Sequence, residues 1–304
     1  MKGIISRPYA SPADFHKVRN LLITTYSLNA PGVNWEIRRW DGKHFHNDDL
    51  SWQPHWEQTR RLWETDSGEL VGVVNPEYIG NFYVQIHPDY RELENEMIAW
   101  AETACATGVP PVVETFTFDH DAPRNHVLKA RGYTRQDSTG MLRRMRFGNR
   151  HLPVVTRAEG YVIRGTSLAD AAGLAALLNA GFNRTIHNEA ELTNFMNFSP
   201  SFRHELNLVA EAADGTLAAH VGVTIDPSLR YGIFEPVVTH PDHRRKGLAQ
   251  TLMIEGMHRA KAAGAGEMLV DTGDDPGANA FYDSMGFAEA YLGHYWKKTI
   301  QTGA

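Results

Sequence analysis

Cysteine is nearly absent from this sequence, in which Cys105 is the single one among 304 residues. One thiol excludes an intrachain disulfide and any metal or redox site built on a pair of cysteines. Cys105 lies in a stretch with apolar periodicity, residues 93–106, so we expect a buried structural thiol. A catalytic cysteine would need a general base beside it, and the sequence places none there.

Long apolar runs and concentrated positive charge are also missing. No run approaches the ~20 apolar residues that a membrane span needs, and residues 1–11 lack the apolar centre of a signal peptide. The net charge is −6, and the basic residues are scattered among acidic ones, so there is no basic surface for nucleic acid. We therefore expect a soluble, cytoplasmic protein that binds neither nucleic acid nor a membrane. Its partner should be a small molecule or another protein.

What the chain does contain is an internal repeat. The pentad HPDYR at residues 87–91 recurs as HPDHR at 240–244, and NHVLKARGY at 125–133 matches NAFYDSMGF at 279–287. A similar turn-forming segment, DSGEL or DGTL, precedes each pentad. Each copy reads as strand, helix, irregular segment, hairpin, strand, turn, helix, strand, helix and strand. Three correspondences in one order predict a duplicated supersecondary arrangement.

The length of the chain fits this duplication, because ~150 residues is an ordinary domain size. We predict two α/β domains with mixed sheets, at residues 1–147 and 159–304. The polar connection between them contains Gly148, Asn149 and Pro153, which favour loops.

The second copy carries a strand at residues 231–239, a basic turn at 244–247 and a helix with one apolar face. That face comprises Ala249, Leu252, Met253, Gly256 and Ala260, which recur at helical spacing. Free backbone N–H groups and the positive end of the helix dipole coincide at such a turn, and a glycine there lets a ligand approach the backbone. The turn therefore predicts a binding site for a pyrophosphate.

The pattern RxxGxA at residues 244–249 resembles the acetyl-coenzyme A loop of the GNAT superfamily of N-acetyltransferases. The segment AxxxYxxxGF at 278–287 is similar to the second signature of that superfamily. The resemblance implies two tandem GNAT acyl-CoA N-acyltransferase folds, with the catalytic one at residues 159–304. The tandem arrangement is also similar to that of mycothiol synthases.

The resemblance implies acetyl-CoA as the cofactor and assigns residues to it. Strand residues should hold the pantetheine arm through their backbone, as in strand addition. Pro236 fits the splay that admits this arm, since proline is confined to edges and bulges of a sheet. The implied cofactor residues are Val237, Val238, Thr239, Arg244, Arg245, Lys246, Gly247, Leu248, Ala249, Gln250 and Asn279.

Acetyl transfer to an amine needs a base for the ammonium and an acid for the departing thiolate. The resemblance places Tyr282 as the acid and Glu235 as the base, acting directly or through water. Tyr282 could instead be a core aromatic, and Glu235 a solvated carboxylate. His240 and His243 are rival bases, but they lie in the turn, where they are expected to cap it or to meet phosphate.

The first copy is predicted to be a degenerate GNAT domain without cofactor. Aligned on the pentads, Glu94 stands in place of Gly247 and Glu96 in place of Ala249, and carboxylates there should repel a pyrophosphate. Leu128 stands where Tyr282 stands in the second copy.

A tryptophan-rich segment, residues 35–63, contains five of the seven tryptophans together with Arg38 and Arg39. It is either a lid over the acceptor or an aromatic core. His44 and His46 near two aspartates could bind a metal, but we predict none. The acceptor pocket should form from this segment, residues 181–204 and the last strands near 291–296.

The predicted function is direct acetyl transfer from acetyl-CoA to a primary amine of a small molecule. Three alternatives stay open: aminoglycoside-type acetylation, acetylation of a protein amine, and an acetyl-CoA-binding sensor or interaction protein without turnover. The sequence predicts neither the acceptor nor the oligomeric state.

Overall fold

The computed structural model describes residues 3–51, 53, 55–156, 158–225 and 229–301. The first half comprises β1 (Ile4–Pro8), α1 (Pro12–Tyr26), α2 (Ile37–Phe45), α3 (His55–Thr59), β2 (Arg61–Thr65), β3 (Leu70–Asn75), β4 (Tyr83–Ile86), η1 (Pro88–Leu93), α4 (Glu94–Ala104), β5 (Val112–Phe118), α5 (Ala122–Ala130) and β6 (Thr134–Arg146). The second half comprises β7 (Tyr161–Gly165), η2 (Leu168–Asp170), α6 (Ala171–Phe182), α7 (Glu189–Phe198), η3 (His204–Leu206), β8 (Asn207–Ala212), β9 (Leu217–Ile225), β10 (Tyr231–Thr239), η4 (Pro241–His243), α8 (Leu248–Ala262), β11 (Glu267–Thr272), α9 (Pro276–Ser284) and β12 (Glu289–Thr299).

The repeat is present in the order of these elements. In each half a strand and a helix precede a hairpin, and a strand, a 3₁₀ turn, a helix, a strand, a helix and a strand follow it. The segments expected to be irregular are helical instead, as α2 and α3 in the first half and α7 in the second. Glu36 and Asn188 accept hydrogen bonds from the first turns of α2 and α7, and such caps allow short helices to form in segments without strong periodicity.

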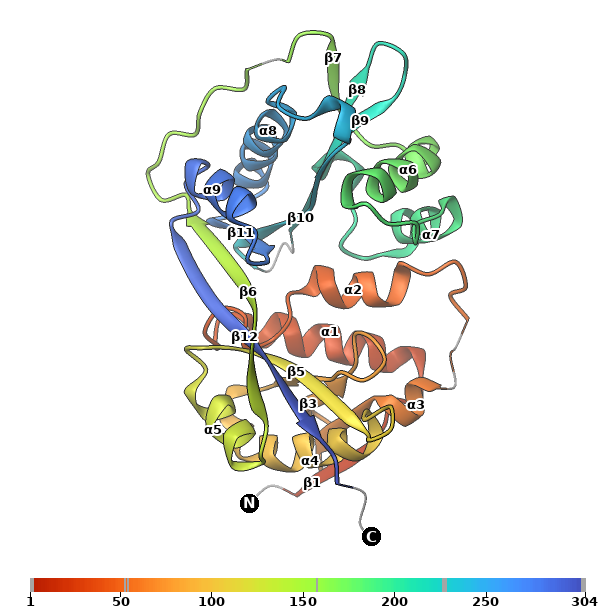
Figure 1. Ribbon diagram of the computed structural model, residues 1–304, viewed down its shortest axis with the longest axis vertical. Coiled ribbons are helices and arrows are strands. Elements are labelled where there is room, and N and C mark those ends of the chain that lie inside the picture. The colour runs from red at the N-terminus through yellow and green to blue at the C-terminus, as the bar shows by residue number, and fades with distance from the viewer. Residues whose placement is uncertain (1–2, 52, 54, 157, 226–228, 302–304) are drawn as a thin grey trace.

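The strands form two sheets that do not follow the division of the chain (Figure 1). One sheet has the order β1-β2-β3-β4, and the other has the order β5-β12-β6-β11-β10-β9-β8-β7. β12 therefore lies between β5 and β6 of the first half, while β6 pairs with β11 of the second half. The predicted domain limits coincide with the connection from β6 to β7, but the larger sheet crosses them.

β10 and β11 separate part of the way along their length, as expected for strands that admit a cofactor. Their parallel pairing runs from Tyr231–Glu267 to Phe234–Val270 and stops there. The antiparallel pairing of β10 with β9 shifts between Phe234 and Val237, around Pro236. From residue 235 onward, β10 keeps β9 on one side and has no paired strand on the other within the part of the chain that the structure describes.

The predicted apolar face of α8 packs in the core of the second half. Leu252, Met253 and Ala260 are fully buried there, beside Phe234 of β10. Cys105 is buried at the end of α4, as expected, and burial raises the pKa of its thiol to about 12. This cysteine is therefore protonated at neutral pH, which fits a structural role.

Candidate active site

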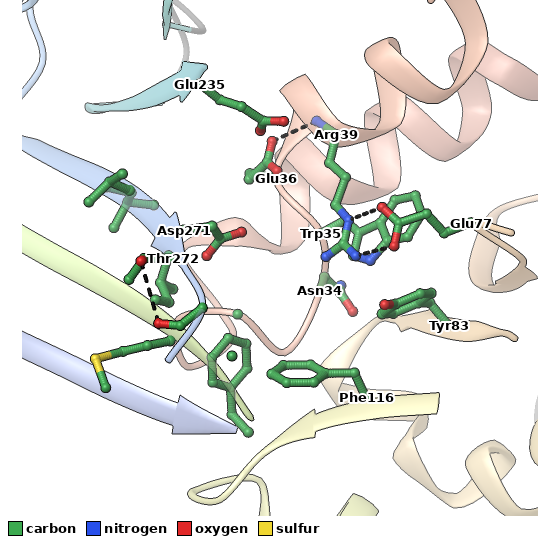
Figure 2. A pocket seen from close by; sticks show the side chains of 18 of the residues that line it. Asn34, Trp35, Glu36, Arg39, Glu77, Tyr83, Phe116, Glu235, Asp271 and Thr272 are labelled. Carbon is green, nitrogen blue, oxygen red and sulfur yellow. Dashed lines mark hydrogen bonds and ion pairs between the residues drawn. The ribbon is translucent and has the colours of Figure 1, made fainter. Parts of the chain in front are cut away.

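A cavity of about 640 Å³ lies where the two halves meet, and both halves line it. The second half contributes the region where β10 and β11 separate, including Glu235, together with Tyr282 of α9. The first half contributes the entrance to α2, the ends of β4 and β5, and part of β6. Figure 2 shows labelled side chains of β4, β5, β10, β11 and the entrance to α2 around one space.

The structure brings the two expected catalytic residues to the same cavity. Glu235 is the first residue of β10 beyond the last pair with β11, and Tyr282 of α9 lines the same cavity. The ring of Tyr282 packs near Phe281 and Phe287, with centroids 5.4 and 6.1 Å away. Burial raises the pKa of Tyr282 to about 12, so its hydroxyl carries a proton at neutral pH. Core packing and a proton-donating role are compatible, because the ring can pack against its neighbours while the hydroxyl carries the proton.

The predicted pyrophosphate turn is an exposed loop at the start of α8, outside the cavity. Arg245 and Gly247 have positive φ angles of 62° and 76°, and Gly247 is the residue that precedes the first turn of α8. A Cβ atom added to Gly247 would have no heavy atom within 4 Å. The backbone of this turn is therefore open to a ligand, and the left-handed conformation explains the glycine.

Several side chains of the turn are engaged within the protein. Arg244 donates to the carbonyl of Gly181 at the end of α6, at 2.9 Å. Lys246 donates to the hydroxyl of Tyr161, which also bonds His243 at 2.8 Å. His240 accepts a hydrogen bond from the backbone of Asp242, so it caps the turn as expected.

The other residues expected to contact the cofactor lie in three kinds of environment: the cavity wall, the core and a hydrogen-bond network. Val237 lines the cavity, whereas Val238 is buried against Gly181 of α6. The Asn279 side chain accepts from Arg143 at 2.7 Å and donates to the carbonyls of Gly273 and Asp275, both at 2.9 Å. It holds the start of α9 to β6, so the structure gives this side chain a structural role.

The sequence did not single out Glu36 and Asp271, two carboxylates that line the cavity. Asp271 follows Val270 on β11 and so is the counterpart of Glu235 on the neighbouring strand. Glu36 precedes α2 in the first half and accepts a hydrogen bond from the backbone of Arg39 at 2.8 Å. Asp271 could have been found from the sequence, because it follows an apolar run at the carboxyl end of a predicted parallel strand, where ligands bind in open α/β sheets. No comparable signal distinguished Glu36 from other helix caps.

The pKa values of Glu36 and Asp271 are both raised. Burial first, and then the charges of Glu235 and Asp271, raise the pKa of Glu36 to about 8. Asp271 is an exposed residue that lines the cavity. Desolvation of its carboxylate by the surrounding protein, together with the charge of Glu235 and against the influence of Arg39, raises the pKa of Asp271 to about 6.

Arg39 is the one cation of the tryptophan-rich segment that faces this cavity among the described residues. Its guanidinium lies over the rings of Trp35 and Tyr83, 4.4 and 4.6 Å from their centroids. Arg38 and Trp40 of the same segment point elsewhere. Arg38 lies over Phe195 of α7, and Trp40 is 2% exposed in an aromatic core; neither lines the cavity.

The tryptophan-rich segment is therefore mostly core and partly pocket wall. Trp40, Trp56 and Trp63 are buried in the first half, and Trp35 lines the cavity. Trp52 lies outside the described residues. From the other expected pocket segments, Phe182, Arg184 and Tyr295 also line the cavity, which agrees with the prediction.

In the first half, a side chain of the protein binds the strand edge that corresponds to the unpaired edge of β10. β4 and β5 meet through a single bridge, Asn81–Glu114, so they separate as β10 and β11 do. The side chain of Asn34 fits between them, accepting from the backbone N–H of Ile86 at 2.8 Å and donating to its carbonyl at 3.0 Å. Ile86 precedes the first pentad as Thr239 precedes the second.

Glu94 does not act as the exposed, repelling charge that we expected. It is fully buried and bonds Arg124 at 2.8 Å, and Arg91 lies 3.0 Å from the same carboxylate. Glu96 is exposed and accepts a hydrogen bond from the indole of Trp63. An ion-pair network, rather than a free carboxylate, therefore fills the place of the pyrophosphate turn.

The histidine segment pairs with the second half instead of forming a metal site. His46 lies 2.8 Å from Glu191 of α7, which also bonds His187. The described residues include no group of three or more His, Cys, Asp or Glu side chains that could hold a metal ion. Nor does any helix in the described ranges have the length and apolar character to cross a membrane.

Comparison with known proteins gives a family for the second half and a fold for the chain. Residues 176–287 match the model of the acetyltransferase (GNAT) family. No curated protein sequence matches the chain.

Solved structures resemble nearly the whole chain. A GCN5-related N-acetyltransferase from Sphaerobacter thermophilus is 18% identical, with 99% of this chain and 97% of that one covered and a TM-score of 0.65. A tandem GNAT protein from the clavulanic acid biosynthesis pathway is 14% identical, with 99% and 100% covered and a TM-score of 0.67. N-myristoyltransferase of Saccharomyces cerevisiae with bound myristoyl-CoA is 12% identical, with 98% and 79% covered and a TM-score of 0.60. Residues 176–287 thus resemble the acetyltransferase (GNAT) family, and nearly the whole chain shares the fold of the tandem GNAT protein.

Proposed function

We propose that this protein transfers the acetyl group of acetyl-CoA directly to a primary amine of a small molecule. The observation that carries the proposal is the position of Glu235 and Tyr282 in one cavity, at the point where β10 and β11 separate. A carboxylate and a protonated phenol on the same cavity supply the base and the acid that amide formation from a thioester needs.

The residues present fit acetyl-CoA. The unpaired edge of β10 beyond residue 234 offers backbone groups to an amide-containing arm, as in strand addition. The backbone around Gly247 is open at the start of the 15-residue helix α8, where a pyrophosphate is favoured. When bound, acetyl-CoA supplies the activated acetyl group.

The side chains of this protein then move two protons. Glu235, directly or through water, takes a proton from the acceptor ammonium, which frees the nitrogen lone pair for attack on the thioester carbonyl. The new C–N bond forms and the C–S bond breaks, so the electron pair of that bond leaves with sulfur. Tyr282 donates its hydroxyl proton to this thiolate, and the phenolate takes up the second proton of the attacking nitrogen, directly or through water, which leaves a neutral amide.

In this proposal the catalytic unit is residues 159–304, and residues 1–147 are a degenerate copy without cofactor. The side chain of Asn34 on the backbone of Ile86, and the buried pair of Glu94 and Arg124, support this division. The first half contributes a wall of the cavity, which helps to exclude water from the thioester.

The test is a transfer assay with the full chain, acetyl-CoA and a panel of primary amines, in which free thiol and acetylated amine are both measured. We expect equal amounts of the two with the right acceptor, and loss of both on Glu235→Gln. Acetyl-CoA binding without transfer to any amine would instead support a sensor. Transfer only to a peptide or protein amine would replace the small-molecule acceptor.

A further inference from the structure

Four carboxylates line the cavity, and one of them, Glu77, is paired with Arg39. The other three, Glu36, Glu235 and Asp271, come from three separate segments. Glu235 and Asp271 are the first residues of β10 and β11 beyond their last pair, so they lie on the two sides of the fork between these strands. Glu36 reaches the same space from the segment that precedes α2 (Figure 2). Adjacent residues of parallel strands project to the same side, which explains why Glu235 and Asp271 face one space.

One oxygen of Glu36 is buried and has no partner. Its Oε2 accepts the backbone N–H of Arg39, but its Oε1 makes no hydrogen bond, although the residue is only 8% exposed. A buried carboxylate oxygen without a donor is unfavourable, so folds keep one only where something offsets the cost. Glu36 lines the cavity, so a donor could reach Oε1 from inside it.

Within the part of the chain that the structure describes, no cationic side chain is bonded to Glu36 or Asp271. The guanidinium of Arg39 makes two hydrogen bonds to Glu77, Nε to Oε1 at 2.8 Å and Nη2 to Oε2 at 2.5 Å. Arg184 also lines the cavity, where it interacts with Glu235 and lies over Phe182. Since the carboxylates do not form a metal-binding group within the described residues, the missing charge fits an organic cation.

The raised pKa values of Glu36, about 8, and Asp271, about 6, agree with this picture. The charged groups that face Glu36 are Glu235, Asp271 and Arg39, and the first two disfavour its ionised form. A bound cation would favour the ionised form of both raised groups.

We propose that the acceptor is at least dicationic: Glu36 and Asp271 bind a second ammonium or similar cation while the primary amine reacts at Glu235. The inference rests on the proposed transfer to a primary amine and specifies the class of that amine. Aromatic rings of Tyr26, Phe116 and Tyr295 in the cavity wall suit the alkyl and cationic parts of such a molecule.

The test measures binding without acetyl-CoA, by calorimetry with the full chain. The probes are α,ω-diaminoalkanes of three to six carbons, each compared with the 1-aminoalkane and the amino alcohol of the same length. We expect the best diamine to bind at least about tenfold more tightly than its two partners. Glu36→Gln should remove most of this preference while leaving monoamine affinity within twofold, because glutamine keeps the acceptor for the Arg39 N–H.

Asp271→Asn provides a second variant on another element, and Glu255→Gln on the outer part of α8 is the matched control. Equal binding of diamine and monoamine, or a preference that survives both cavity substitutions, would overturn the inference. An alkane-1,6-bis(trimethylammonium) probe separates this outcome from failure of the proposed function, since it cannot be acetylated. If this probe binds and the two cavity substitutions weaken its binding, the dication site stands even when no transfer is found. If transfer occurs but dications bind no better than monoamines, the dication site is wrong and the proposed transfer stands.

Discussion

Arg39 and Glu77 form an ion pair inside the cavity, and the two residues come from segments on either side of the β2–β3 hairpin. The pair holds the guanidinium over Trp35 and Tyr83, so it fixes this part of the cavity wall. The first half therefore contributes an ordered wall to the cavity.

Arg39→Ala should raise the acceptor KM about tenfold and leave the Kd for acetyl-CoA unchanged, because the rings of Trp35 and Tyr83 would lose the guanidinium that packs over them and the cavity wall would lose its fixed shape. Trp40→Ala is the matched control from the neighbouring position. It should lower stability by about 3–5 kcal/mol with little change in KM, since Trp40 lies in the core. Steady-state kinetics at matched fractions folded would decide, and equal KM values for both variants and the wild type would leave the first half a supporting role only.

Tyr282→Phe should lower kcat by roughly 10²–10⁴ and keep the Kd for acetyl-CoA, because the ring still packs and only the proton donor is lost. Tyr133→Phe removes a hydroxyl from the core of the first half and should leave kcat within twofold. A Tyr282→Phe enzyme with wild-type turnover would make this tyrosine a core residue alone.

Gly247→Ala should weaken acetyl-CoA binding about tenfold, because a Cβ at φ 76° strains the turn and intrudes where a pyrophosphate would approach. Gly215→Ala is the matched control, with φ 86° and equally open surroundings in the β8–β9 turn. It should cost a similar amount of stability, about 1–2 kcal/mol, and not change binding.

Calorimetry should also give one acetyl-CoA site per chain for the wild type. Two equivalent sites would contradict the proposal that the first half binds no cofactor. Equal losses of acetyl-CoA affinity in the Gly247→Ala and Gly215→Ala variants would contradict a role of the turn at Gly247 in binding.

Glu36→Gln should become more stabilising as the pH rises. A carboxyl whose pKa is raised in the folded state favours folding below its unfolded pKa, and this contribution is lost as the pH rises through the folded pKa. For Glu36 this loss occurs between about pH 4.5 and about pH 8. Within this range, the free energy of unfolding changes by at most about 1.4 kcal/mol per pH unit.

The measurement is the difference in Tm between Glu36→Gln and the wild type across pH 4–9, which cancels the other titrating groups. We expect the difference to grow with pH between about pH 4.5 and about pH 8 and to be flat above this range. A difference that is independent of pH would show that the carboxyl of Glu36 is not perturbed.

Arg124→Leu should lower the free energy of unfolding by about 3–5 kcal/mol, because it leaves Glu94 buried without its main partner. The double variant Glu94→Leu/Arg124→Leu should recover part of that loss, as a hydrophobic pair needs no counter-charge. Denaturant unfolding gives both values. Equal losses in the single and double variants would mean that the pairing itself contributes little.

Local sequence signals predicted the elements well where hydrophobic periodicity or glycine chemistry decides the structure. The strand at 231–239, the turn at Gly247 and the buried face of α8 all follow from such signals. The position of Glu235 and Tyr282 in one cavity followed from a motif that combines several of them.

What the sequence did not predict depends on contacts between distant segments. Nothing near Glu36 indicates that it faces Asp271, since the two residues meet only when the halves pack together. The same holds for Asn34 on Ile86 and for Arg124 on Glu94, where an amide and an ion pair replace a ligand. Alignment of the two copies indicated that the first had changed, but not what filled the space.

The place of β12 in the sheet has a consequence for how the protein is made. On the ribosome, β5 and β6 are synthesised more than 140 residues before the strand that belongs between them. Until residues 289–299 emerge, the first half exposes two unsatisfied strand edges, and Tyr295, a wall residue of the cavity, is still missing. The nascent first half therefore lacks a strand of its own sheet until β12 is synthesised, and a chain that stopped before residue 289 would have neither half complete.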